Sequence, residues 1–249
     1  MDACLTAGEA LRRSFRRPVE SQKKGDIDYV SEVDQRSQEI VRQTLGRRSQ
    51  FPVVGEESGE PPTPEGTYWL VDPLDGTTNF LRGYPVFCVS IALVNAETVW
   101  VAAVYDPVHH ELFTAQEGKG AWLNGAPISV ARTESLGEAV LSTGFPYDAW
   151  TCNANPTEAL EAFVRRVVTV RCDGAAALDL CQVAAGRIDG HWERGLGPWD
   201  VAAGSLIVRE AGGTVTGERG EPFSLSAGSI AAGAAKVHAA MVEVLRSLG

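Results

Sequence analysis

The sequence predicts an α+β layered sandwich, in which helices cover the faces of β-sheets. A series of apolar, strand-like segments separated by turn residues occupies the first part of the chain and is typical of an antiparallel meander. After Pro156, helix-like and strand-like segments alternate, and both ends of the chain have helical character. Each helix or sheet must bury its apolar face against another element, so these segments predict stacked layers.

Two helices are expected before the meander. The apolar spacing of residues 1–17 is that of an amphipathic helix, and the polar residues 18–27 predict a loop. A second helix is expected over residues 31–45, with Gly46 as the first residue beyond it. Asp34 lies beside the apolar stripe of this second helix, so its carboxylate needs a partner.

The remaining elements follow in chain order. We expect an N-terminal α+β part over residues 1–140 and a C-terminal α/β part over residues 141–249, joined in one compact unit. In the first part, apolar runs bounded by turn residues predict strands at 51–54, 68–71, 87–94, 98–105, 111–115 and 121–123. In the second part, strands at 168–171 and 188–192, and a short strand pair after residue 213, alternate with helices at 157–167, 175–185, 200–210 and 234–248.

The charge balance excludes several classes of function. The 249 residues include 22 Lys and Arg and 32 Asp and Glu, which gives a net charge of −10. Nucleic acids and acidic membranes attract a positive field, so we expect neither as a partner. No apolar run reaches the ~18 residues of a transmembrane helix, and the N-terminus lacks the features of a secretory signal. We therefore expect a cytoplasmic protein.

Cysteine and histidine chemistry has no support in the sequence. The five cysteines are scattered and never paired as CxxC, so neither a zinc site nor a disulfide framework is predicted. The four histidines form no ligand pattern. If the protein is an enzyme, carboxylates carry its chemistry.

The densest chemical signal lies in residues 69–80, WLVDPLDGTTNF. An apolar strand ends at Asp72, Pro73 turns the chain, and Asp75 begins a stretch with the character of a helix N-terminus. Two carboxylates three residues apart at such a turn can share hard cations, while the free N–H groups of residues 76–78 face an anion. The alternative is an Asp-Pro turn followed by a capped helix.

Further acids lie at the ends of apolar segments. Glu56 follows a strand-like run and is either a metal ligand or part of a solvated loop. Asp200 starts a helix of small residues, either as its N-cap or as a cation ligand. Clustered acids without basic partners are costly unless cations neutralise them, and oxygen ligands alone favour Mg²⁺ or Mn²⁺ over zinc. Together, five acids predict a multi-metal site: Asp34, Glu56, Asp72, Asp75 and Asp200.

These residues resemble the signatures of the inositol monophosphatase family, which are magnesium-dependent, lithium-sensitive phosphatases. The resemblance runs almost from end to end, and the run DPLDGTTN is highly specific. The matching segments are 28–34 (DYVSEVD), 55–58 (GEES), 69–80, 174–180 (GAAALDL), 186–193 (GRIDGHWE) and 199–204 (WDVAAG).

The resemblance implies an α-β-α-β-α fold, usually a homodimer, with two to three Mg²⁺ ions. Glu56, Asp72 and the backbone carbonyl of Leu74 would hold the first ion. Asp72, Asp75 and Asp200 would hold the second, and Glu56 would help to hold a weaker third. One ion would make hydroxide near neutral pH, and another would stabilise the leaving alkoxide.

The resemblance also assigns catalytic and substrate-binding roles. Thr77 with Glu56 would orient the attacking water, and Asp34 would support Thr77 from behind. The implied substrate contacts are Asp75, Gly76, Thr77, Gly174, Ala175, Ala176, Glu193 and Asp200.

Two departures from the family pattern concern the substrate side. Ala175 stands where the family usually has Ser or Thr, which removes one hydroxyl from the expected pocket. Residues 147–156 (YDAWTCNANP) match no family pattern. Glu193 matches the position that binds sugar hydroxyls in inositol-selective members, and the alternative is a surface acid at the end of a strand.

The predicted function is hydrolysis of myo-inositol 1-phosphate, or a related polyol or sugar phosphate, by in-line attack of a metal-activated water. Fructose-1,6-bisphosphatase and histidinol phosphatase are alternatives within the superfamily. Thr78 and Asn79 argue against a 3′-phosphoadenosine 5′-phosphate phosphatase, because such an enzyme usually has Lys-Glu after Asp-Gly-Thr. The alternative from another class is a catalytically idle regulator that binds RNA or protein, and loss of the metal ligands would be its mark.

Overall fold

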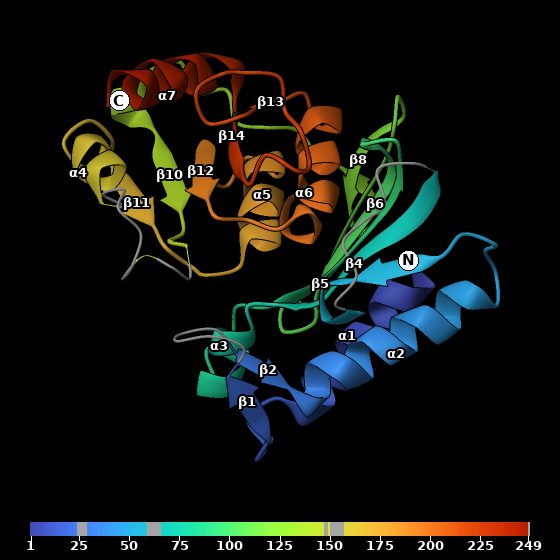
Figure 1. The fold of residues 1–249 in the computed structure, drawn as a ribbon. Coiled ribbons are helices and arrows are strands. Elements are labelled where there is room, and N and C mark those ends of the chain that lie inside the picture. The colour runs from blue at the N-terminus through green and yellow to red at the C-terminus, as the bar shows by residue number, and fades with distance from the viewer. Residues whose placement is uncertain (24–28, 59–65, 147–148, 150–156, 249) are drawn as a thin grey trace.

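Five layers build the molecule, in the order helices, sheet, helices, sheet, helices (Figure 1). The computed structural model describes residues 1–23, 29–58, 66–146, 149 and 157–248. The arrangement confirms the predicted α-β-α-β-α sandwich. Within the described residues, three groups of buried apolar side chains hold the layers together.

The large sheet has seven strands that lie side by side in chain order. Its first two strands pair in parallel, and every later pair is antiparallel, which confirms the predicted meander. The strands are β3 (Val53–Gly55), β4 (Thr67–Asp75), β5 (Cys88–Asn95), β6 (Thr98–Asp106), β7 (Glu111–Gln116), β8 (Gly120–Leu123) and β9 (Ala126–Pro127).

Helices α1 (Asp2–Ser14) and α2 (Glu32–Gly46) cover one face of the large sheet (Figure 1). A capping box starts α2, because the Ser31 hydroxyl accepts from the Val33 N–H and the Asp34 carboxylate accepts from the Ser31 N–H. Gly46 is the last helical residue and Arg47 follows in a right-handed conformation. The expectation that Gly46 lies beyond the helix is therefore wrong, because this helix end uses no left-handed residue.

A short hairpin precedes α2. Strands β1 (Ser21–Lys23) and β2 (Tyr29–Ser31) pair antiparallel, so the prediction of a loop over residues 18–27 is wrong for β1. Because β1 contains three polar residues and no alternation of apolar side chains, periodicity could not reveal it.

The small sheet has five strands, in the order β11-β10-β12-β14-β13. Strand β10 lies parallel to β11 and β12, whereas β14 is antiparallel to both of its neighbours. The sequence pattern does not predict β10, because its two apolar residues are followed by Ser142 and Thr143. The strands are β10 (Val140–Thr143), β11 (Thr169–Arg171), β12 (Gly190–Arg194), β13 (Thr214–Thr216) and β14 (Ser229–Gly233).

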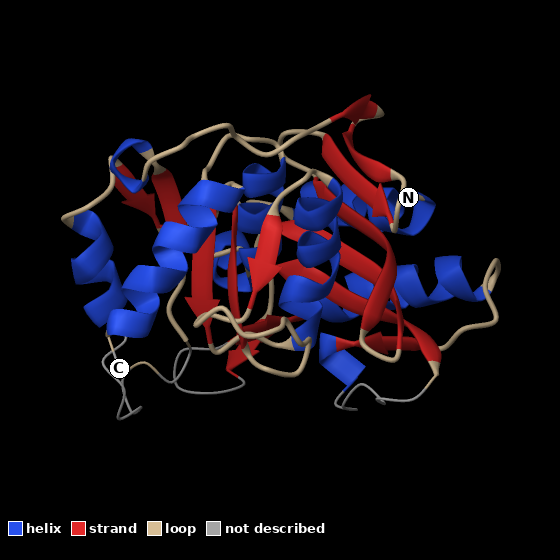
Figure 2. Cartoon of the chain, turned by 90° about the horizontal axis from the view of Figure 1, so that it is seen from above, coloured by secondary structure: helices blue, strands red, loops and turns tan. Residues whose placement is uncertain are grey.

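Two helices lie between the sheets and two cover the outer face of the small sheet (Figures 1 and 2). The inner pair is α5 (Ala176–Ala184) with α6 (Pro198–Glu210), and the outer pair is α4 (Glu158–Val164) with α7 (Ala235–Ser247). A Cβ atom at Gly204 of α6 would lie 2.5 Å from Leu180 Cδ1 of α5, so this glycine lets the inner helices approach closely. In the described part of the chain, no helix combines the length and apolar character needed to span a membrane.

Candidate active site

A cavity of about 390 Å³ lies where the ends of β4 and β12 meet the starts of α3 (Thr77–Arg82) and α6. Most of the predicted site residues line it, although they are far apart in the sequence. Asp34 and Ala175 are not among its lining residues. The predicted residues that do line it are Glu56, Asp72, Leu74, Asp75, Gly76, Thr77, Gly174, Ala176, Glu193 and Asp200.

The end of β4 holds two of the acids in fixed positions. The pairing of β4 with β5 shifts register between Asp72 and Asp75, so both carboxylates belong to an irregular strand end. Asp72 Oδ1 accepts a hydrogen bond from the Leu74 N–H at 3.0 Å. Asp75 Oδ2 accepts one from the Ala177 N–H at 2.9 Å, which ties the large sheet to the start of α5.

The turn into α3 depends on glycine and on an amide side chain. Gly76 has a φ of 89°, and a Cβ atom there would lie 2.8 Å from the Val86 carbonyl oxygen. Asn79 Nδ2 donates to the carbonyl oxygens of Val86 and Asp173, each at 2.8 Å. The start of α3 is therefore fixed against the loop that leads into α5.

Thr77, which lines the cavity, contacts Asp34, which does not. Thr77 Oγ1 lies 2.8 Å from Asp34 Oδ1 and 3.0 Å from the Leu74 carbonyl oxygen, and both are acceptors. Asp34 is only 1% exposed, and its Oδ2 accepts from the backbone N–H of Ser31 at 2.8 Å and from the Ser31 hydroxyl. The buried acid therefore has the partners that its burial requires.

Glu56 and Asp200 line the cavity from two different elements. Glu56 follows β3 in a short 3₁₀ helix, Glu56–Ser58. Asp200 is the third residue of α6, and its Oδ2 accepts from the Gly197 N–H at 2.7 Å. The prediction that Asp200 itself starts the helix is wrong, because Gly197 is the N-cap and Pro198 takes the first helical position, where proline is favoured.

The charged side chains among the described lining residues of the cavity are all acids. Burial raises the pKa of Asp72 well above its ordinary value, and the carboxylates around it, Glu56 first, raise the pKa further. Burial and neighbouring acids raise the pKa of Asp200 in the same direction. Burial, more than the nearby Glu193 and Glu56, raises the pKa of Asp75 to about 7. The lining residues that the structure describes include no Lys, Arg or His.

This donor set fits hard divalent cations. Four carboxylates that share one cavity, Glu56, Asp72, Asp75 and Asp200, repel one another, and cations would reduce that repulsion. The donors are oxygens, which suits Mg²⁺ or Mn²⁺. Across the described residues, no three Asp, Glu, His or Cys side chains already stand as a formed ligand cluster. The acids share one cavity, and an ion would have to draw their oxygens together.

The substrate side of the cavity comes from the small sheet and α5. Glu193 of β12 and Gly174 line it, and Gly174 has a φ of 75°. Ala175 is 2% exposed and packs in the core beneath α5, so its methyl group points away from the cavity lining. Of the unmatched segment 147–156, only Ala149 lies within the described residues, and Asp28 of the first signature lies outside them.

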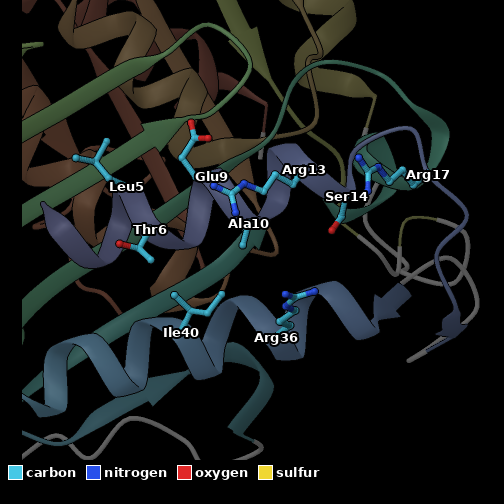
Figure 3. A pocket seen from close by; sticks show the side chains of 9 residues that line it. All are labelled: Leu5, Thr6, Glu9, Ala10, Arg13, Ser14, Arg17, Arg36 and Ile40. Carbon is cyan, nitrogen blue, oxygen red and sulfur yellow. The ribbon is translucent and has the colours of Figure 1, made fainter.

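A larger cavity, of about 630 Å³, lies between α1 and α2 (Figure 3). Figure 3 shows arginines from both helices at this groove, Arg13 on α1 and Arg36 on α2. Glu9 is its one lining acid among the described residues. Size therefore favours this groove, but the chemistry of clustered, buried acids favours the smaller cavity as the active site.

Some residues that shape the site were not predicted from the sequence. Ser31 and Ser37 belong to α2 and its cap, and the Ser37 hydroxyl donates to the Pro73 carbonyl oxygen at 2.6 Å. His191 and Gly144 lie next to Glu193. Serine at helical spacing from Asp34 was a usable signal, whereas the neighbours of Glu193 depend on strand pairing that the sequence does not show.

A model of the inositol monophosphatase family matches residues 1–248. The chain belongs to the inositol monophosphatase family. This membership confirms the resemblance that the signatures carry.

Relatives with two different names are equally similar to this family member. The inositol-1-monophosphatase of Synechocystis is 41% identical over 98% of this chain and 86% of its own. The inositol-1-monophosphatase of Rhizobium meliloti is 40% identical over 99% of this chain and 94% of its own. The protein named Nus factor SuhB of Escherichia coli is 41% identical over 98% of this chain and 93% of its own.

Solved structures of the family share the fold. The inositol monophosphatase of Anabaena has a TM-score of 0.89 and 36% identity, over 100% of this chain and 94% of its own. The extragenic suppressor protein suhB of Bartonella henselae has a TM-score of 0.90 and 37% identity, over 98% of this chain and 96% of its own.

Proposed function

We propose that this protein is a metal-dependent phosphomonoesterase that hydrolyses myo-inositol 1-phosphate or a related polyol or sugar phosphate. The observation that carries the proposal is the group of acids in one cavity, Asp72 and Asp75 buried among them, with no Lys, Arg or His among the lining residues that the structure describes. Family membership and the relatives named inositol-1-monophosphatase support the same reaction class. Fructose-1,6-bisphosphatase and histidinol phosphatase activities are the alternatives within this chemistry.

The residues that would hold the metal are those at the two strand ends and at α6. Glu56, Asp72 and the Leu74 carbonyl would hold one Mg²⁺, and Asp72 with Asp75 and Asp200 a second. A weaker third ion would involve Glu56. When bound, such ions lower the pKa of a coordinated water and stabilise negative charge on the leaving oxygen.

Thr77 and Asp34 would position the attacking water. If the Thr77 hydroxyl donates its proton to Asp34 Oδ1, at 2.8 Å, its oxygen lone pairs are left to accept a hydrogen bond from water. Asp34 is held in turn by Ser31, so the direction of that hydroxyl is fixed before substrate arrives. Glu56 would be the second group that orients the water.

Backbone and side-chain groups around the cavity would bind the substrate. Gly76 and Thr77 would place their N–H groups against the phosphate at the start of α3. Glu193 would accept hydrogen bonds from the sugar hydroxyls. With one such acceptor, we expect several polyol phosphates to be hydrolysed within about two orders of magnitude of one another.

The test is phosphate release from a panel of phosphomonoesters with Mg²⁺, comparing the wild type with Asp72→Asn. Loss of the shared ligand charge should lower turnover by about 100-fold or more, because both ion sites weaken. Glu161→Gln, an exposed acid on α4 with 69% of its side chain accessible, is the matched control and should keep full activity. Near wild-type turnover of a folded Asp72→Asn protein would refute the two-metal assignment.

A non-catalytic binding role is the second candidate function. Relatives at 41% identity carry the name Nus factor SuhB, which is not the name of an enzyme. The presence in the cavity of all four acids expected to bind metal, Glu56, Asp72, Asp75 and Asp200, favours the phosphatase. We also propose a homodimer and inhibition by Li⁺, which the family resemblance implies, and a cytoplasmic location, which rests on the sequence alone.

A further inference from the structure

The Glu193 carboxylate lies against buried groups of the small sheet, on the side away from the cavity. His191 and Glu193 are two residues apart on β12, so they share one face of the strand. The His191 side chain is 0% exposed, and that of Glu193 is 12% exposed. An acid that faces a cavity is therefore packed directly beside a fully buried imidazole.

The contacts of the imidazole leave one nitrogen for Glu193. His191 Nδ1 lies 2.9 Å from the Ser142 hydroxyl oxygen. His191 Nε2 lies 3.3 Å from Glu193 Oε2, and it makes no hydrogen bond to any of the described residues. A buried polar atom of this kind needs a partner, and the Glu193 carboxylate is the acceptor beside it.

These contacts are consistent with one tautomer of a neutral histidine. If the Ser142 hydroxyl donates to Nδ1, the proton of the ring lies on Nε2 and points at Glu193. The other nearby acid is Asp179, whose Oδ2 is 3.9 Å from Nδ1. Burial, followed by the neighbouring acids Asp173, Glu193 and Asp75, raises the pKa of Asp179 well above its ordinary value.

Gly144 completes the surroundings of the carboxylate. A Cβ atom at Gly144 would lie 2.0 Å from Glu193 Oε1 and 2.4 Å from its Cδ, so any other residue would push the carboxylate away. Strand pairing explains the arrangement, because Ser142 of β10 lies opposite His191 of β12 and Gly144 directly follows β10. The parallel register therefore brings all of these groups to one place.

We propose that Ser142, His191 and Gly144 form a cradle that fixes the Glu193 carboxylate toward the cavity, and that His191 is the positioning residue which sets selectivity for hydroxylated phosphate esters. The inference rests on the proposed function, since it assigns Glu193 to the substrate hydroxyls. A fixed acceptor loses less conformational freedom on binding than a mobile one, so the cradle strengthens discrimination without touching the phosphate chemistry.

The kinetic test compares a polyol phosphate, myo-inositol 1-phosphate, with phenyl phosphate, which has no hydroxyl for Glu193. His191→Phe keeps a buried ring but removes the donor, and Gly144→Ala displaces the carboxylate without changing any charge. Each should lower the ratio of kcat/KM for the polyol to that for phenyl phosphate by about 10-fold, mainly through KM. His191→Gln, which restores an N–H donor, should recover part of the ratio.

A double-mutant cycle makes the kinetic test decisive. In a Glu193→Ala background, His191→Phe should have no further effect on the ratio, because its only route to the substrate has been removed. An equal loss for both substrates, or an undiminished effect of His191→Phe in that background, would overturn the proposal. If the wild type hydrolyses neither ester, the proposed function fails, and the cradle is decided by the spectroscopic measurement below.

The spectroscopic test does not depend on activity. Long-range ¹H–¹⁵N spectra report the tautomer of each of the four histidines, and His191→Phe assigns the signal. We expect a neutral His191 with its proton on Nε2, and a shift of that proton in Glu193→Ala. A proton on Nδ1, or a signal that Glu193→Ala leaves unchanged, would overturn the proposal.

Discussion

At the scale of single residues, the site depends on acids whose partners differ in kind. Asp34 is satisfied by neutral donors, the Ser31 N–H and the Thr77 hydroxyl. Asp72 and Asp75 each accept one backbone hydrogen bond, Asp75 also accepts one from the Cys88 thiol, and both lie close to further acids. The hydrogen bonds to Asp34 hold its carboxylate in place, whereas the acids around Asp72 and Asp75 favour cation binding.

The Thr77 hydroxyl should act in the transition state more than in binding. Thr77→Ala removes the group that would orient the attacking water, so kcat should fall by about 100-fold with little change in KM. Steady-state kinetics with the polyol phosphate measure kcat and KM separately. Thr77→Ser, which keeps the hydroxyl, is the control. A change confined to KM would instead assign Thr77 to phosphate binding.

The raised pKa values predict how the metal-free protein responds to pH. Asp75 has a pKa of about 7 in the folded chain, above its ordinary value of 3.8, so the folded state binds more protons between these values. Its contribution to stability is present below about pH 4 and is lost as pH rises through 7. In EDTA, Asp75→Asn should therefore gain stability relative to the wild type as pH rises from 5 to 8. Urea titrations at each pH measure this, and a constant difference would contradict it.

At the scale of elements, the inner helices show how the fold is packed around the site. Helix α6 runs through the centre of the molecule, and its residues from Val201 to Val208 are buried. It carries Asp200 at one end, and Gly204 lets it lie against α5. The position of Asp200 in the cavity therefore depends on the close packing of α6 against α5 at Gly204, one helical turn away.

Gly204→Ala should destabilise the protein by overpacking. The new Cβ atom would lie 2.5 Å from Leu180 Cδ1 and 2.6 Å from Leu180 Cβ, so the helices must separate. The expected loss is about 1–3 kcal/mol, measured by urea unfolding. Gly46→Ala is the matched control, because no atom lies within 4 Å of its Cβ position and it should stabilise α2 by up to about 1 kcal/mol. Equal stability of the two variants would contradict close packing at Gly204.

Elements with a long apolar pattern could be predicted from the sequence, and short ones could not. The long apolar runs of β5 and β6 and the helical spacing of α2 predicted them within one or two residues of their ends. Strands β1 and β10 have too few apolar residues to show a period. The start of α6 was misplaced because the cap is Gly197, which has no side chain to signal it.

At the scale of the whole molecule, the layers bring distant residues to one cavity. The acids could be recognised because each ends an apolar segment or resembles a family signature, but their meeting depends on which strands neighbour which. Strand β3 pairs in parallel with β4, which places Glu56 beside the end of the strand that carries Asp72. The contacts of Glu193 likewise depend on the register of β10 with β12. The division at residue 140 remains a prediction.

Mg²⁺ should stabilise the entire fold. The proposed ligands belong to the 3₁₀ helix that follows β3, to β4 and to α6, so the ion would join the edge of the large sheet to the central helix layer. At 100 times its dissociation constant, Mg²⁺ should add about 2.7 kcal/mol to the free energy of unfolding, which is a rise in Tm of roughly 5–10 °C. Differential scanning calorimetry measures this rise, and Asp200→Asn should reduce it. An unchanged rise in that variant would remove Asp200 from the ligand set.

The two sheets divide the work of the cavity between them. The acids proposed for phosphate chemistry come from the large sheet and α6, whereas Glu193 and its neighbours come from the small sheet. If the proposed roles are correct, mutation of the small sheet would change which alcohol is released while the reaction itself is preserved. In evolutionary terms, the fold separates a part that must stay constant from a part that is free to vary, so new substrates can be acquired without inventing a new mechanism.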